Sequence, residues 1–275
     1  MSTLLSTSEL IKKYDLNAKR SLGQNFILDK NFTDKIIKSC GYLLNEEILE
    51  VGPGPGSLTR SILDANCKKL IVIEKDERCL ELLKELKDFY QDRLEIINFD
   101  ALEIDETKLF LGQKFKIIAN LPYNIGTVLL FKWLKIADQI SSMHLMLQKE
   151  VVERIVAKAG SKHYGRLAVM VNFLCETKMV FEVNRMVFNP PPKVTSAIVE
   201  IIPRSKPLFD VDFKKLERVV AAAFNQRRKM IKSSLKSVNN NAEEILRSLN
   251  IKPELRAENL TIEEFCKIAR SFIPN

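Results

Sequence analysis

The chain has 275 residues, of which 46% are hydrophobic and 28% charged, and its formal net charge is +8. This balance is typical of a soluble globular protein with one large and one small domain. No apolar run approaches the roughly 18 residues that span a bilayer, and the N-terminus lacks the apolar core of a secretory signal. We therefore expect neither a membrane protein nor a secreted one.

Short apolar runs rich in β-branched residues alternate with helix-like segments through the first two-thirds of the chain. The expected strands are residues 48–51, 70–74, 94–98, 115–120 and 143–148. The expected helices between them are residues 57–65, 76–89 and 127–137. This alternation predicts an α/β fold, in which a mainly parallel sheet carries helices on both faces.

The last third of the chain has a different pattern. One more strand is expected at residues 195–202, after a run of prolines, and the remainder reads as helices at 213–225, 228–238, 242–249 and 261–272. The sequence predicts a flexible N-terminal arm over residues 1–17, an α/β domain over 18–203 and a small all-helical domain over 204–275.

Charge is unevenly distributed between these domains. Residues 204–275 contain 15 Lys and Arg against 9 Asp and Glu, whereas residues 1–203 contain 28 against 26. A basic small domain suggests a polyanionic partner such as a nucleic acid. The five cysteines include no C-x-x-C pair and there are only two histidines, so we expect reduced thiols, a cytoplasmic protein and no metal site.

Three consecutive strand ends carry groups suited to binding one ligand. The first strand leads into a glycine-rich turn that begins at Gly52, where a ligand can approach the backbone closely. The second strand ends at Glu74, whose carboxylate can accept hydrogen bonds from both hydroxyls of a ribose, and the third ends at Asp100, which can meet the amine of an adenine. Together they predict a crevice for an adenosine-containing ligand at the carboxyl edge of the sheet.

The fourth strand ends in Asn120-Leu121-Pro122-Tyr123, which suits methylation of an aromatic amine. The lone pair of adenine N6 is delocalised into the ring, so acceptors on its N–H groups are needed to aim the lone pair at a methyl group. The Asn120 side-chain carbonyl and the Leu121 main-chain carbonyl can be those acceptors. Pro122 stiffens the loop. The Tyr123 ring can stack on the base, a role for which its hydroxyl is not needed.

Together with the preceding glycine turn, this loop resembles that of the ribosomal RNA adenine dimethyltransferases, and the match to the bacterial KsgA type is close. Further segments that are similar to motifs of that family are residues 21–26, 146–151, 164–167, 188–194 and 224–229. The resemblance implies a Rossmann-like class I methyltransferase domain at 18–203 and a helical RNA-binding domain at 204–275. It implies S-adenosylmethionine as methyl donor, contacted by Asn25, Ile27, Gly52, Glu74, Asp100 and Asn120.

The implied reaction dimethylates the N6 amines of two adjacent adenines in a hairpin loop near the 3′ end of 16S ribosomal RNA. The implied catalytic residues are Asn120, Leu121, Pro122 and Tyr123. The implied partner is the small ribosomal subunit or its precursor, and we expect the chain itself to be a monomer.

Basic residues of the small domain are candidates for RNA contact. Arg228, Lys232 and Lys236 follow one another at intervals of four, which places them on one face of the helix expected at 228–238. Arg227 precedes this helix, and Phe188 opens the loop that the resemblance places beside the target base. We expect the basic side chains to contact phosphates.

Three alternatives stay open. The first is a large-subunit ribosomal RNA adenine methyltransferase of the Erm type, which has a similar Asn-Leu-Pro-Tyr loop. The second is a non-catalytic assembly factor that binds immature small subunits. The third is a dinucleotide oxidoreductase, whose G-x-G-x-x-G spacing differs from the G-x-G-x-G found here.

Overall fold

The structure is a computed structural model that describes residues 4–19 and 22–272. It divides into two compact units. The first combines the chain up to Val152 with Lys178–Pro203, and the second combines Glu153–Thr177 with the chain from Arg204 onward. The break at 203 lies where the sequence places a domain boundary, but Glu153–Thr177 groups with the helical unit and not with the α/β domain.

The second unit recruits this segment through its backbone. The carbonyls of Phe173 and Leu174 accept the N–H groups of Leu208 and Arg204, each at 2.8 Å.

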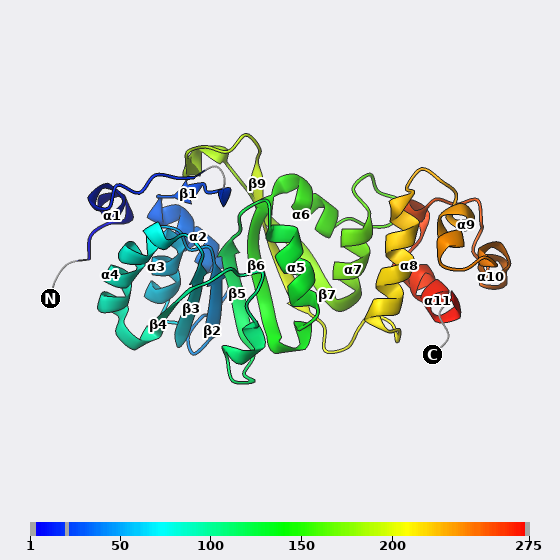
Figure 1. The fold of residues 1–275 in the computed structure, drawn as a ribbon, viewed down its shortest axis with the longest axis horizontal. Helices are drawn as coiled ribbons and strands as arrows, with labels where there is room; N and C mark the ends of the chain where they lie inside the picture. The colour runs from blue at the N-terminus through cyan, green and yellow to red at the C-terminus, as the bar shows by residue number, and fades with distance from the viewer. Residues whose placement is uncertain (1–3, 20–21, 273–275) are drawn as a thin grey trace. The chain divides into compact units, whose positions relative to one another are not determined.

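In the described part of the chain, seven strands form one sheet in the order β4-β3-β2-β5-β6-β9-β7 (Figure 1). Their bounds are β2 (Glu47–Val51), β3 (Lys69–Glu74), β4 (Leu94–Asn98), β5 (Phe115–Asn120), β6 (Ile140–Gln148), β7 (Cys175–Val183) and β9 (Ser196–Pro203). β2 to β6 pair in parallel, and β9 is antiparallel to β6. Parallel neighbours bring the carboxyl ends of β2, β3, β4 and β5 to one edge of the sheet.

Helices cover both faces of this sheet. Neighbouring residues of β3 point to opposite faces, and both Leu70 and Ile71 are completely buried, as expected for a sheet covered on each side. The helices of this part of the chain are α2 (Lys30–Ser39), α3 (Ser57–Asp64), α4 (Leu80–Tyr90), α5 (Gly126–Leu134) and the first residues of α6 (Lys149–Ile155), which continues into the second unit from Glu153. The predicted α/β class, with helices on both faces, is confirmed.

A second, two-stranded sheet lies apart from the main one. β1 (Phe26–Ile27) pairs antiparallel with β8 (Phe188–Asn189), so that Ile27 faces Phe188 and Phe26 faces Asn189. This pairing brings the segment before α2 next to the segment before β9, although some 160 residues separate them in sequence.

The described part of the expected arm is folded. Helix α1 (Thr7–Lys13) begins with a capping box, in which Ser6 and Glu9 each bond the other's backbone N–H. Leu10 and Leu16 are buried in the same apolar cluster as Ile36 and Leu86. Leu10 in α1 and Leu16 after it provide the apolar contact that a flexible arm would lack. Residues 1–3 lie outside the described residues.

The second unit contains the remaining helices: α7 (Arg166–Leu174), α8 (Phe213–Asn225), α9 (Ile231–Ser234), α10 (Ala242–Ser248) and α11 (Ile262–Phe272). α8 buries Leu216, Val219, Val220 and Ala223 along one side, which is the spacing of an amphipathic helix. The Phe224 ring packs against Tyr164 and Phe265, with ring centroids 6.1 and 5.7 Å away. The helical small domain is thus present.

The helix expected at 228–238 is much shorter. α9 begins at Ile231, and residues 235–237 form a 3-10 turn. Met230 pairs with Arg256 as an isolated antiparallel bridge, and the Ile231 N–H is bonded to the Leu255 carbonyl at 2.6 Å. This pairing holds the backbone extended just before Ile231, so Arg228 cannot belong to the same helix as Lys232.

Candidate active site

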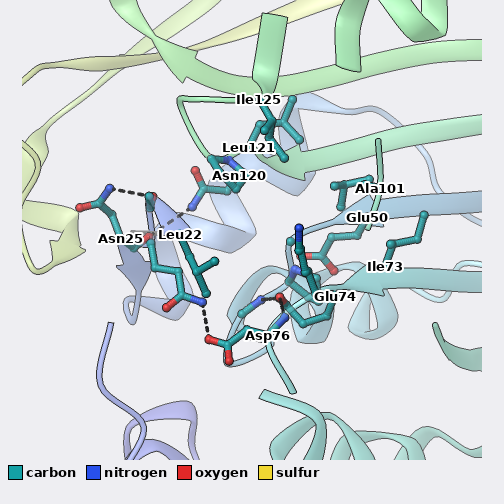
Figure 2. A pocket seen from close by; sticks show the side chains of 18 of the residues that line it. Leu22, Asn25, Glu50, Ile73, Glu74, Asp76, Ala101, Asn120, Leu121 and Ile125 are labelled. Atoms are coloured by element: carbon teal, nitrogen blue, oxygen red, sulfur yellow. Dashed lines mark hydrogen bonds between the residues drawn. The ribbon is translucent and has the colours of Figure 1, made fainter. Parts of the chain in front are cut away.

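A cavity of about 280 Å³ opens at the carboxyl edge of β2, β3, β4 and β5. Each of the four strand-end segments singled out in the sequence lines it. Figure 2 shows the side chains of Asn25, Glu74, Asp76 and Asn120 around this one space. The fold therefore assembles in one place the groups that the sequence predicts for cofactor and catalysis.

The glycine turn after β2 lines the cavity. Gly52 and Gly54 both have positive φ, at +69° and +53°, a region that side chains rarely adopt. A Cβ on Gly54 would lie 3.2 Å from the Phe26 ring, and a Cβ on Gly52 would lie 3.5 Å from the Pro122 ring. The turn leads directly into α3, so its backbone can lie close to a bound molecule.

Glu74 lies at the end of β3 and is nearly buried, with 6% of its surface exposed. Its carboxylate accepts the backbone N–H of Gly54 at 3.0 Å and that of Asp76 at 2.8 Å, one on each oxygen. Burial raises the pKa of Glu74, and these two bonds act against that rise. A carboxylate has about four acceptor positions, so two remain for a ligand. Glu74 therefore shapes the turn as well as facing the cavity.

Asp100 follows β4, the strand next to β3 in the sheet. One oxygen accepts the Lys75 ammonium at 2.6 Å and the other accepts the Leu102 N–H at 2.9 Å. The hydrogen bond from Lys75 holds the pKa of Asp100 below its ordinary value. Asp100 lines the cavity, as does its neighbour Phe99, whose ring is exposed.

The side-chain carbonyl of Asn120, the last residue of β5, and the main-chain carbonyl of Leu121 accept no hydrogen bond within the described residues. The Asn120 amide donates to the Asn25 carbonyl at 3.4 Å, while its side-chain oxygen has no partner among residues 4–19 and 22–272. The Leu121 N–H is bonded to the Met146 carbonyl at 3.3 Å. The Leu121 carbonyl accepts no hydrogen bond within the same described ranges. Two acceptors are thus available at the end of the strand.

Pro122 and Tyr123 complete the loop. The Pro122 carbonyl accepts the N–H groups of Ile125 and Gly126, at 3.2 and 3.1 Å, which closes the turn into α5. The Tyr123 hydroxyl lies 2.6 Å from the Ser196 hydroxyl at the start of β9. The Tyr123 ring is half-buried and lines the cavity.

The segment before β1 lines the cavity as well. Its Gln24 amide donates to Asp76 at 2.8 Å, and Asp76 also accepts the Arg78 guanidinium at 2.6 Å. Asn25 and Ile27 line the cavity, and the Ile27 carbonyl accepts the Ser57 hydroxyl. Ser21, the first residue of the expected entry motif, lies outside the described residues.

Comparison with known proteins identifies the family. Residues 15–273 match the family described as ribosomal RNA adenine dimethylase. The chain belongs to this family.

A relative from Paramagnetospirillum magneticum supports this membership. It is named ribosomal RNA small subunit methyltransferase A and is 46% identical over 271 residues, covering 98% of this chain and 96% of that protein.

Solved structures agree with the fold. A dimethyladenosine transferase from Plasmodium falciparum is 29% identical, with a TM-score of 0.77 over 88% of this chain and 95% of that one. The 23S rRNA methyltransferase ErmE is 24% identical, with a TM-score of 0.69 over 90% of this chain and 99% of that one. The latter likeness concerns the fold alone.

Of the basic residues expected to contact RNA, some are paired with other groups of the chain and others are exposed. Arg227 donates to Glu258 and to the Lys162 carbonyl, both at 2.8 Å. Lys232 is paired with Glu243 at 3.0 Å. Arg228 and Lys236 are exposed. The structure therefore does not arrange Arg228, Lys232 and Lys236 as one stripe along a helix.

Phe188 is buried, with 3% of its surface exposed, in the two-stranded sheet. Its contact with RNA stays a prediction.

Sequence reasoning missed Asp76, which lines the cavity, and Ser196, which bonds Tyr123. Asp76 lies two residues after Glu74 and accepts a hydrogen bond from Gln24 of the segment before β1. Ser196 lies four residues after the last proline of the 190–192 run. Asp76 has a local signal, because an acidic residue after a strand end can cap the next turn, and it accepts the Arg78 N–H in that way. Ser196 has none, because its partner is 73 residues away.

Two further findings concern the described residues only. No cluster of three or more His, Cys, Asp or Glu side chains there is suited to a metal ion. Likewise, the helices in residues 4–19 and 22–272 include none that is long and apolar enough to cross a membrane.

Proposed function

We propose that this chain transfers methyl groups from S-adenosylmethionine to the N6 amines of two adjacent adenines near the 3′ end of 16S ribosomal RNA. The observation that carries the proposal is the meeting of Asn120–Tyr123 with the glycine turn and Glu74 in one cavity. Binding of an adenosine-containing donor and activation of an aromatic amine both require groups of these kinds, and here they share one space.

The residues present fit the donor. Gly52 and Gly54 leave the backbone of the turn without a Cβ at two positions, and the two remaining acceptor positions of Glu74 suit the two hydroxyls of a ribose. Asp100 can accept a hydrogen bond from an adenine amine, and Asn25 and Ile27 close the cavity from the other side. When bound, S-adenosylmethionine supplies an electrophilic methyl group on a positively charged sulfur.

On the acceptor side, the loop after β5 orients the target amine. The free carbonyls of Asn120 and Leu121 accept the two N–H groups of adenine N6, which draws the nitrogen toward a pyramidal geometry. Pro122 fixes the loop, and the Tyr123 ring supports the extruded base by stacking. Attack leaves an acidic ammonium that releases its proton to water, so the loop needs no strong base.

The RNA partner is proposed from the family and from charge. Residues 204–275 carry most of the net positive charge, and their exposed Arg228 and Lys236 are suited to phosphate contacts. We propose that the substrate is the RNA within the small subunit or its precursor, that the reaction takes place in the cytoplasm, and that the chain acts as a monomer.

Mass spectrometry of ribosomal RNA tests the proposal. Small subunits from a methylation-deficient strain are incubated with the chain and S-adenosylmethionine, with large-subunit RNA in a parallel reaction. Two adjacent dimethyladenosines in 16S RNA are expected, with no product in 23S RNA. Product in 23S RNA alone would favour the Erm type. Binding without any product would favour an assembly factor.

A further inference from the structure

The hydroxyls of Tyr123 and Ser196 form an isolated pair. Their oxygens are 2.6 Å apart, and Ser196 is completely buried. Neither hydroxyl has another hydrogen-bond partner within residues 4–19 and 22–272. A buried hydroxyl is costly to leave unpaired, so each of these groups depends on the other.

The backbone at Ser196 is held in place by its pairing within the sheet. It is the first residue of β9, and its backbone faces Gln148, the last residue of β6. The preceding Thr195 carbonyl accepts the Lys149 N–H at 2.9 Å. Backbone pairing on both sides of this position leaves the serine little freedom to move. The bond therefore attaches the catalytic loop to a rigid part of the sheet.

The Tyr123 side chain, in contrast, needs a contact that fixes the orientation of its ring. It follows β5 on a loop, and in the sheet β6 lies between β5 and β9. A tyrosine ring can turn about two side-chain torsions, and a base stacks only on a ring held in one orientation. Burial raises the pKa of Tyr123, so the phenol keeps its proton and remains a neutral hydrogen-bonding group. Its hydroxyl is thus able to bond Ser196.

We propose that Ser196 is a positioning residue for methyl transfer: its buried hydroxyl holds the phenol of Tyr123 and so fixes the ring on which the target adenine stacks. This inference rests on the proposed function. It also revises the expectation from sequence that the Tyr123 hydroxyl is dispensable, because the ring alone does not determine its own orientation.

The pair also links the catalytic loop to the loop that enters β9. Pro190–Pro192 lie between β8, which is paired with β1, and Ser196. One end of this proline segment is therefore held beside the cavity by β1, and the other end bonds the catalytic tyrosine. Displacement of either end would shift the stacking surface.

A double-mutant cycle tests the proposal. Tyr123→Phe and Ser196→Ala each remove one oxygen of the same bond, and the double variant removes both. Ser142→Ala is the matched control, because Ser142 is a buried serine on neighbouring β6 whose hydroxyl has no partner in the described part of the chain. Single-turnover transfer to small subunits at saturating cofactor gives the rate, and steady-state assays give kcat and KM.

We expect each single variant to be slower by about 3- to 10-fold, the effect of one neutral hydrogen bond, and the double variant to be no slower than either. The loss should appear in kcat, with KM for small subunits and the affinity for S-adenosylmethionine within about twofold of wild type. The control should react at the wild-type rate. If Ser196→Ala does not fold, Tyr123→Phe still reports on the bond from the other side.

Other outcomes overturn the proposal. Effects that multiply in the double variant would mean that the two hydroxyls act independently. A wild-type rate for Ser196→Ala, or an equal loss in Ser142→Ala, would reduce Ser196 to a packing residue. Failure of the wild-type chain to methylate any ribosomal RNA would overturn the proposed function, and the inference with it. An active wild type with an unaffected Ser196→Ala would overturn the inference alone.

Discussion

Replacement of Asn120 by alanine tests the proposed chemistry most directly. The side-chain carbonyl of Asn120 has no partner among the described residues and Asn120 lines the cavity, while its amide makes only a long bond of 3.4 Å to the Asn25 carbonyl. Asn120→Ala therefore removes a free acceptor and little that holds the fold together.

The magnitude follows from these contacts. An acceptor that acts on charge developing in the transition state is worth roughly 3–4 kcal/mol, so the rate should fall by about 10²–10³. The 3.4 Å bond is at the weak end of its class and should contribute less than about 1 kcal/mol to cofactor affinity or stability. The rate at saturating cofactor should consequently fall much further than the affinity for S-adenosylmethionine.

The assay is single-turnover methyl transfer to small subunits at saturating cofactor, with cofactor affinity measured by calorimetry. Asn31→Ala serves as the control, because Asn31 is an exposed asparagine in the first unit that does not line the cavity. A wild-type rate for Asn120→Ala would refute the role of this side chain. A loss confined to cofactor affinity would refute it as well.

Other positions give predictions of different kinds. Glu74→Ala removes the proposed acceptor of the ribose hydroxyls, so calorimetry should show S-adenosylmethionine affinity at least roughly tenfold lower, and unchanged affinity would contradict that role. Burial raises the pKa of Glu50 from 4.5 to about 8, so over this range the folded chain binds a proton that the unfolded chain has lost, and stability declines as pH rises. Glu50→Gln cannot titrate at this position. As pH rises, its free energy of unfolding relative to that of wild type should therefore increase by up to about 1.4 kcal/mol per pH unit in denaturant titrations. A difference that does not change with pH would contradict the assignment. Replacing both Arg228 and Lys236 by alanine should weaken binding to small subunits and make its salt dependence shallower, by about 1 in slope per lost phosphate contact. Lys232→Ala should change that slope less, because its ammonium is already paired, and an equal change would contradict this reasoning.

The sequence by itself determined the features that depend on local pattern. Strands of a parallel sheet covered on both faces read as nearly continuous apolar runs, so β2, β3 and β5 were found close to their observed bounds, as was the less buried edge strand β4. The glycine turn at Gly52 and the loop at Asn120 were found because they immediately follow those strands. Parallel topology then brings strand ends together without further information. The roles of the individual residues within that site stay predictions.

Strand β7 was not predicted, although its sequence carries a local signal for a strand. β7 has apolar Cys175, Met179 and Val183 on one set of alternating positions, which is the period of a strand. The start of the helix expected at 228–238 had no comparable signal. The pairing of Met230 with Arg256 stops that helix from starting earlier, and no local pattern announces a partner 26 residues ahead.

Only the tertiary structure decided which distant groups meet. It buried Leu10 and Leu16 of the expected arm, paired Lys232 with Glu243, and grouped the segment Glu153–Thr177 with the helical unit. It also placed Ser196 against Tyr123. A hydrogen bond between two hydroxyls 73 residues apart depends on the registers of β6 and β9 and on the turn after β5, and none of these is encoded next to either residue.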